Sequence, residues 1–403
     1  MTGTAIRPSR GLDDVRVAWH NRAMRWSLVL SALVVVPFVL RYLGYHSMID
    51  LSVYRSEGFA LRHRIDIYGP INAVYDLRAT YPPFAVLCFT GLTVVPLQAL
   101  FVLSAAANVA LLAVAIELSR RLIARRCGPI HPCAVPLLTA AAVWCEPVFT
   151  TVCYGQINLL VLVLVLWDFT RPAESRSRGI ALGVAVGLKI TPALFVVYLL
   201  ITRRSRIAAR AAAAFAATVL VSAAALPGET WRFWTRLVFD TGRVGNIANP
   251  ANQSLRGVLT RAVGAFDLGA LGPAVIGAVA VLGLGCSVLA YRRRGEAWGL
   301  CTAAVTGLLV SPVSWTHHWV WCVPVALLLW AATRASPPAV RVALLLAFLL
   351  AFLSYLPSII PSDHVANLHL NAGEQLISLP YVAFGLAFLV LAVTRWERPR
   401  PSK

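Results

Sequence analysis

The sequence predicts an all-α integral membrane protein that crosses the bilayer many times. Of its 403 residues, 59% are hydrophobic and 13% are charged, whereas soluble domains carry about 25% charged residues. Apolar runs near twenty residues long recur along the chain, which is the length that spans a bilayer as a helix. The ten-residue alternation of a membrane β-barrel is not visible. We therefore expect one membrane domain, residues 24–394, with about ten to twelve helices across the bilayer.

The positive charge predicts the orientation of the chain. The formal net charge is +19, and every basic residue except Lys189 and Lys403 is an arginine or a histidine. Arginines cluster between apolar runs, as the positive-inside rule predicts for cytoplasmic loops of a plasma-membrane protein. Both tails, 1–23 and 395–403, then lie in the cytoplasm, and anionic membrane lipids rather than nucleic acid are the expected partners of this charge.

The first half of the chain contains one regular span and several interrupted ones. A first span at about 24–43 delivers the loop 44–81 to the outside, where SVYRSEGFALRHRIDIYG suits a helix lying in the membrane interface. An apolar stretch at 84–119 is broken near Pro96. The next segments are two short runs at 134–147 and 156–170 around a polar turn, TTVCYGQIN, and two half-length helices at 179–202 that meet near Lys189 and Pro192.

The second half has a regular span at 207–226, followed by the external loop 227–268. Trp231 and Trp234 suggest a second interfacial helix in that loop, and NIANPANQSLRG reads as an ordered polar loop. The remaining expected spans are 270–291, 297–312, 319–333, 341–356 and 376–394.

Asp50 is the candidate general base. It follows the first span and is flanked by Ile49 and Leu51, and partial loss of water raises the basicity of a carboxylate. The alternative is that Asp50 caps the following helix. Because the polar residues outside the arginine clusters gather in the external loops, we expect the site at the outer, periplasmic face of the membrane.

Several basic residues are candidates for binding phosphate. Lys189 lies within a broken apolar segment, where an ionisable group suggests function, although its side chain could instead snorkel to the interface. In WTHHW, His317 and His318 point about 100° apart on a helix, so we expect one to hydrogen-bond a phosphate or sugar while the other packs. Arg256 offers a bidentate fork for phosphate.

Several functional classes lose support. The eight cysteines show no CxxC pairing, so neither a disulfide framework nor a metal site is indicated. The sequence has no Gly-rich phosphate loop and no HExxH motif, which weakens ATP-driven transport and metalloprotease interpretations.

The motifs together resemble glycosyltransferase family 87, the polyprenol-phosphate-mannose-dependent mannosyltransferases of mycobacteria and related actinobacteria. The resemblance covers about residues 25–335 and rests on DLSVYR, TYPPF, GQINLLVLVLVLWDF, GLKITP, NQSLRG and SPVSWTHHWVW. It implies a GT-C fold and an inverting transfer from a polyprenyl-phosphate-mannose donor. The implied acceptor is a mannosylated glycolipid, either a phosphatidylinositol mannoside or the lipomannan and lipoarabinomannan backbone, with an α-1,2 linkage.

The resemblance also assigns roles to residues. Asp50 matches the catalytic base, and His318, Lys189, Arg256 and His317 are the candidates for binding the donor phosphate. The expected sugar or acceptor pocket comprises Tyr54, Arg55, Gln156, Asn158 and Asn252. No nucleotide sugar is implied, and a metal is not expected to be required, because the leaving group is a lipid phosphate.

Two alternatives remain open at this stage. A flippase or transporter of lipid-linked sugars would use the same charges for binding alone, although no internal repeat of the kind found in many transporters is visible. A related enzyme with another polyprenyl-phosphate sugar, such as arabinofuranose, would share these motifs, since the shape of the pocket decides the sugar.

Overall fold

The computed structural model describes residues 10–69, 77–361 and 366–394. Within these residues every regular element is a helix, and Asn252 and Trp315 form an isolated antiparallel bridge. The all-α prediction is confirmed. Residues 1–9 and 395–403, which belong to the expected cytoplasmic tails, lie outside the described ranges.

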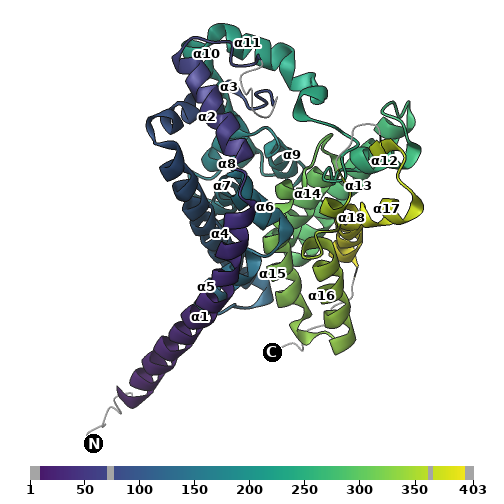
Figure 1. Cartoon of the computed structure of the whole chain (residues 1–403). Coiled ribbons are helices and arrows are strands. Elements are labelled where there is room, and N and C mark those ends of the chain that lie inside the picture. Colours follow the sequence, from purple (N-terminus) through teal and green to yellow (C-terminus); the bar gives the residue numbers. More distant parts are fainter. Residues whose placement is uncertain (1–9, 70–76, 362–365, 395–403) are drawn as a thin grey trace, which may run out of the picture.

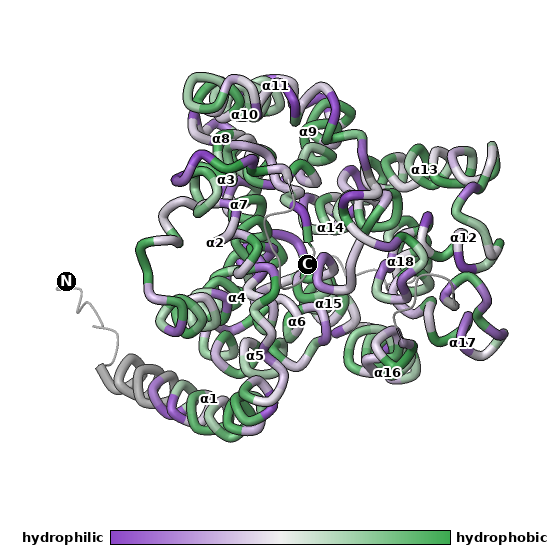
Figure 2. Tube along the Cα trace, turned by 45° about the horizontal axis from the view of Figure 1, so that its top comes forward, coloured by the Kyte–Doolittle hydropathy of each residue, from purple (hydrophilic) through white to green (hydrophobic). Residues whose placement is uncertain are grey.

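Five helices in the described ranges are long and apolar enough to cross a membrane: α1 (Arg10–Tyr45), α4 (Leu97–Cys127), α10 (Ser205–Ala225), α13 (Leu271–Arg294) and α16 (Pro338–Phe352), which continues as an apolar segment to Ile359. Several of them expose large apolar side chains, such as Leu33, Val281 and Leu346. Exposed apolar bands of this kind suit contact with lipid rather than water. Figure 2 shows these long helices as mostly hydrophobic, with hydrophilic residues concentrated between helices.

The remaining helices are shorter. They are α2 (Ile49–Arg62), α3 (Pro83–Phe89), α5 (Val135–Ala142), α6 (Glu146–Tyr154), α7 (Asn158–Thr170), α8 (Ile180–Leu188), α9 (Ala193–Ile201), α11 (Pro227–Thr235), α12 (Leu255–Val263), α14 (Glu296–Val310), α15 (Cys322–Ala332), α17 (Ala372–Ile377) and α18 (Pro380–Val393). The expected ten to twelve crossings would need some of these shorter helices as well as the five long ones, so that number stays a prediction.

The polar turn expected at TTVCYGQIN is wrong for its first half. Residues up to Tyr154 belong to α6, which bends by 75° from α5 and its preceding turn. The threonines tolerate this helix because their hydroxyls find partners: Thr150 donates to Glu146 at 2.6 Å, and Thr151 donates to the carbonyl of His317 at 3.2 Å. The turn proper begins at Gly155.

The predicted break between two half-length helices is confirmed. α8 ends at Leu188, Lys189 is extended with φ −152°, and α9 begins at Ala193 after Pro192. Small residues let α8 approach α10 closely, since a Cβ on Gly183 would lie 2.3 Å from the carbonyl oxygen of Ala211. The two half-helices therefore place Lys189 at a fixed point inside the helical bundle.

Both expected external helices are present, but α2 is more deeply packed than an interfacial helix. Its face bearing Tyr54 and Glu57 is buried, and a Cβ on Gly58 would lie 2.4 Å from the carbonyl oxygen of Phe89. α11 keeps more of the expected character, because Trp231 is 72% exposed while Phe233 is buried. In Figure 1 α2, α10 and α11 lie toward the upper end of the molecule, and α1 begins at the lower end.

Candidate active site

Asp50 is positioned by a sharp connection between α1 and α2. Only residues 46–48 separate the helices, and Met48 adopts the left-handed conformation with φ 47°. The amides of Ser47 and Met48 both donate to the carbonyl of Cys153, at 3.2 and 2.9 Å, which ties the connection to the end of α6. Asp50 then falls in the first turn of α2, half-buried.

The structure argues against the helix-cap interpretation of Asp50. The N-cap of α2 is Met48, and no side chain caps that position. The carboxylate of Asp50 instead accepts a hydrogen bond from the side chain of Gln156. Gly155 makes this approach possible, because it has φ +68° and a Cβ there would lie 2.6 Å from the Cβ of Leu51. A larger residue would push α2 away from Gln156.

Two tyrosines orient the amide of Gln156. Tyr54 donates to its side-chain oxygen at 2.8 Å and Tyr81 at 3.1 Å, and the two hydroxyls lie 2.7 Å apart. Since the carbonyl oxygen of the amide receives both hydroxyls, its NH₂ group is the end that faces Asp50. The two tyrosines therefore hold the NH₂ group of Gln156 in the orientation in which it donates to Asp50, the candidate base.

Burial changes the acidity of the two carboxylates on α2. It raises the pKa of Asp50 to about 6, although the hydrogen bond from Gln156 and the positive charge of Lys189 act in the opposite direction. Glu57 is fully buried, and burial together with the charge of Asp50 raises its pKa well above the usual range. At neutral pH Asp50 is thus ionised and more basic than an ordinary aspartate, while burial favours the neutral form of Glu57.

Lys189 lies opposite this group and makes polar contacts with two other elements. Its Nζ donates to the Oδ1 of Asn158 at 2.7 Å and lies 3.3 Å from the Nε2 of His318. The ring of Tyr81 is 5.6 Å from the same ammonium group, and Asp50 interacts with it electrostatically. Lys189 therefore does not snorkel to the interface; it joins the two sides of the site.

The histidines lie on the 3₁₀ segment Thr316–Trp321 rather than on an α-helix. Their rings are 4.8 Å apart at 84°, so they diverge as expected: His318 reaches Lys189, and His317 packs against Tyr154. The carbonyl of His317 accepts from Asn158 at 2.8 Å. The Nε2 of His317 is buried and has no hydrogen-bond partner in the described residues.

Buried polar groups hold this segment in place. Thr316 donates to Glu146 at 2.9 Å, and Tyr381 donates to the other oxygen of the same carboxylate. Asn252 acts on the preceding residues: its side-chain oxygen accepts from the amide of Ser314 at 2.9 Å, and its backbone bridges to Trp315. Asn252 is fully buried, so its observed role is to position the histidine segment.

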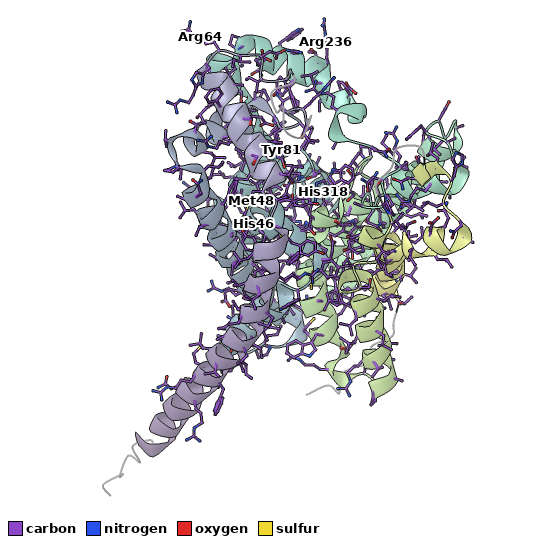
Figure 3. The ribbon with its side chains drawn as sticks, viewed as in Figure 1. His46, Met48, Arg64, Tyr81, Arg236 and His318 are labelled. Atoms are coloured by element: carbon purple, nitrogen blue, oxygen red, sulfur yellow. The ribbon has the colours of Figure 1, made fainter. Side chains whose placement is uncertain are left out.

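A cavity opens beside the polar group. Its polar end contains Asn158, Lys189, His318 and Ser314, and its walls are mainly apolar side chains of α7, α9, α14 and the 3₁₀ segment, among them Val161, Leu162, Phe195, Leu308 and Trp321. Figure 3 shows Met48, Tyr81 and His318 near the middle of the molecule, well below Arg64 and Arg236. Asp50 does not line this cavity but interacts electrostatically with Lys189, which does. A basic carboxylate near a cation suits removal of a proton next to an anionic group.

Comparison with known protein families indicates which class of reaction this site belongs to. Residues 79–312 match the model described as glycosyltransferase family 87, which is more than half of the chain. The chain belongs to glycosyltransferase family 87. No solved structure matches it.

Curated relatives extend this family 87 match toward both ends of the chain. A Mycobacterium tuberculosis protein named polyprenol-phosphate-mannose-dependent alpha-(1-2)-phosphatidylinositol pentamannoside mannosyltransferase is 39% identical over 81% of this chain and 76% of its own length. Another from the same species, named for phosphatidylinositol mannoside, is 30% identical over 95% of this chain and 94% of its own. A Mycolicibacterium smegmatis relative with the pentamannoside name is 35% identical, covering 75% and 74%.

Two of the candidate residues of this family 87 protein, Arg55 and Arg256, do not line the cavity at Lys189. Arg55, next to Tyr54 on α2, is half-buried, and its Nε has no hydrogen-bond partner in the described residues. Arg256 lies on α12. Phosphate binding by Arg256 and acceptor binding by Arg55 stay predictions.

Residue-level reasoning assigned no role to three side chains of this site: Tyr81, Glu146 and Thr316. TYPPF was noted as a motif, but the role of Tyr81 depends on a partner 75 residues away. Glu146 was expected among the polar residues of the outer side, and its place between two apolar runs was a signal for a role, since ionisable residues in such places suggest function. Among the described residues, no group of three or more His, Cys, Asp and Glu side chains could hold a metal.

Proposed function

We propose that this family 87 protein transfers mannose from a polyprenyl-phosphate-mannose donor to a phosphatidylinositol mannoside, with inversion and an α-1,2 linkage. The observation that carries the proposal is the electrostatic interaction of Asp50 with Lys189, whose side chain in turn lines a cavity with apolar walls. The names of the relatives, which specify this donor and this class of acceptor, support the choice of substrates.

In the proposed reaction a hydroxyl of the acceptor attacks C1 of the donor mannose. Asp50 takes the proton of that hydroxyl while the new C–O bond forms. The bond between C1 and the phosphate oxygen breaks, and its electron pair leaves with the polyprenyl phosphate. Attack opposite the leaving group converts a β-linked donor into an α-linked product. The ammonium of Lys189 and the imidazole of His318, 3.3 Å apart, stabilise the charge that grows on the phosphate.

The apolar walls of the cavity suit the first isoprene units of the donor. Leu162 and Val165 of α7, Phe195 of α9 and Leu308 of α14 face this space. Its volume, about 60 Å³, is below the range of about 300–1,000 Å³ typical of ligand sites, so these helices would have to separate to admit the isoprene units. The phosphate would then lie at the polar end, against Lys189. Tyr54 and Gln156 would shape the sugar site, on the side of Asp50.

The orientation in the membrane is part of the proposal. The arginine clusters would face the cytoplasm with both tails, and Asp50 would open to the outer leaflet, where a lipid-linked rather than nucleotide-linked sugar is the available donor. Neither a nucleotide nor a metal is required, because the leaving group is already a lipid phosphate. Transfer should therefore persist in the presence of a metal chelator; complete loss that Mg²⁺ or Mn²⁺ restores would contradict this point.

The main test replaces Asp50→Asn in the full-length protein and measures transfer of labelled mannose from polyprenyl-phosphate-mannose to phosphatidylinositol mannosides. A general base contributes about 10²- to 10⁴-fold to a rate, so we expect a loss of that size with donor binding retained. Asp66→Asn is the matched control. Asp66 is an exposed carboxylate of the same loop, paired with Arg232 at 2.9 Å, and its loss should leave the rate within about threefold.

A full rate in Asp50→Asn would overturn the assignment of the base. A flippase, by contrast, would keep moving lipid-linked sugar in this variant without forming a product. The acceptor and linkage are tested by mass spectrometry of the product before and after digestion with an α-1,2-specific mannosidase. A product that resists the enzyme, or transfer of arabinofuranose in preference to mannose, would contradict the proposed substrates.

A further inference from the structure

A second cavity lies at the other end of α4 from Asp50. Its volume is about 380 Å³, and it is lined by the C-terminal ends of α4 and α13 and the first residues of α14. That volume is within the range of about 300–1,000 Å³ typical of small-molecule sites. α4 connects the two regions: Leu100 packs in the cluster that contains Tyr54 and Tyr81, and Arg125 lines this second cavity about 38 Å further along the helix.

The walls of this cavity carry four arginines. Two are held by the scaffold: Arg125 donates to the carbonyl of Phe169, and Arg294 donates to that of Leu391 at 3.1 Å and stacks on Trp298 at 4.0 Å. The other two are Arg126 on α4 and Arg292 on α13, one on each wall and both exposed. Neither makes a hydrogen bond or ion pair to another described residue. Their guanidinium groups are available to a ligand.

One carboxylate also lines the cavity, but its charge is already compensated. Glu296 pairs with Arg204 at 2.6 Å and with Arg178 at 3.1 Å, and these two side chains are only 12% and 4% exposed. Tyr198 donates to its second oxygen at 3.2 Å. Because Glu296 has two cationic partners of its own behind the wall, the cavity stays strongly positive.

We propose that this cavity binds the phosphate headgroup of an anionic phospholipid. Guanidinium forks match the geometry of phosphate oxygens. The cavity lies at the ends of two membrane-length helices, which is the level of lipid headgroups, and positive residues there attract anionic lipid. Exposed arginines on both walls favour a lipid with two phosphates, such as diphosphatidylglycerol. A bound lipid bridges α4 and α13 and stabilises their junction with α14.

The ligand is tested on the full-length protein, freed of lipid in an uncharged detergent. Diphosphatidylglycerol, phosphatidylcholine and inorganic phosphate are added separately at equal concentrations, and bound lipid is counted by native mass spectrometry beside thermal unfolding. We expect diphosphatidylglycerol to bind and to raise the unfolding temperature more than either of the others. Equal binding of phosphatidylcholine, or equal stabilisation by inorganic phosphate, would overturn the proposal.

The location is tested with matched double variants. Arg126→Gln with Arg292→Gln removes two charges from the cavity, and Arg176→Gln with Arg206→Gln removes two exposed arginines elsewhere. Each arginine near an anionic headgroup contributes about fivefold to affinity, so the first pair should weaken diphosphatidylglycerol binding about twenty-fivefold and the second less than twofold. Equal weakening would show that total charge, not this cavity, binds the lipid. Mannosyl transfer should survive in both pairs, which separates this test from that of the active site.

Discussion

Charged side chains lie near both ends of α4, but they have opposite surroundings at the two ends. Near Leu100 the charges of Asp50 and Lys189 are half-buried, and each has a polar side-chain partner, Gln156 for Asp50 and Asn158 for Lys189. Near Arg125 the exposed charges are guanidinium groups, and the carboxylate of Glu296 is already paired with Arg178 and Arg204.

The difference follows from the cost of desolvation. A charge taken out of water is tolerated only when it has partners in good geometry, so the region around Asp50 needs many specific side chains from distant parts of the sequence. Exposed arginines keep their water and need no such partners, so a single one can be replaced without affecting its neighbours. We therefore expect substitutions near Asp50 to change the rate strongly and substitutions near Arg125 to leave it largely unchanged.

The largest effect that tests this contrast comes from Lys189→Met. The variant keeps the length of the side chain but removes the charge that lies 3.3 Å from His318, and loss of one group that stabilises transition-state charge costs about 10²- to 10³-fold in kcat. The measurement is transfer at saturating donor. Arg206→Gln, an exposed arginine of α10, should leave kcat within about twofold. Equal losses of kcat in the two variants would contradict the expected difference between the charges near Asp50 and the exposed arginines.

A smaller loss is expected from Asn158→Leu. Asn158 is a positioning residue: its amide oxygen accepts from Lys189 at 2.7 Å, and its NH₂ donates to the carbonyl of His317 at 2.8 Å. A buried polar group left without its partner costs about 1–3 kcal/mol, so kcat should fall about ten- to a hundredfold. Asn158→Asp, which keeps the acceptor for Lys189, should recover part of the rate. No recovery would mean that Asn158 acts through packing alone.

The pH dependence is the next smaller effect. Burial raises the pKa of Asp50 to about 6, and the base works in its deprotonated form. The rate should therefore be near its maximum at about pH 7 and fall as the pH drops through 6, reaching about one tenth at pH 5. An ordinary exposed aspartate would hold the rate to about pH 4. A profile measured at saturating donor that stays flat down to pH 4.5 would contradict the burial of Asp50 in the working enzyme.

Much of this structure could be predicted from residue patterns, and the exceptions have a common cause. Apolar length predicted α1, α10 and α13, and the pair Lys189 and Pro192 predicted the break between α8 and α9. Local sequence also drew attention to Asp50, Lys189 and His318, because charges in apolar surroundings stand out.

Partners and burial were harder to predict because they depend on packing between distant segments. Tyr54 and Gln156 are 102 residues apart, and Lys189 and His318 are 129 apart. Helical periodicity carries no information on such pairs. The same limit explains Thr150, whose hydroxyl reaches Glu146 and so allows helix where a polar turn was expected, and Glu57, which reads as a surface residue of an interfacial helix and is fully buried.

Replacement of Glu57 has the smallest expected effect on kcat, and it tests whether Asp50 is the only ionised carboxylate in the reaction. Burial and the nearby charge of Asp50 raise its pKa well above the usual range, which favours the neutral carboxyl in the folded protein. Glu57→Gln should then keep kcat within about threefold. A raised pKa in the folded state means that stability from this group is greatest below its unfolded pKa and is lost as pH rises. The glutamine variant should consequently unfold at an equal or higher temperature than the unsubstituted protein at pH 8. As the pH falls, the unfolding temperature of the unsubstituted protein should rise relative to that of the variant. A hundredfold loss of activity in Glu57→Gln, with its folding intact, would place a second ionised carboxylate in the reaction.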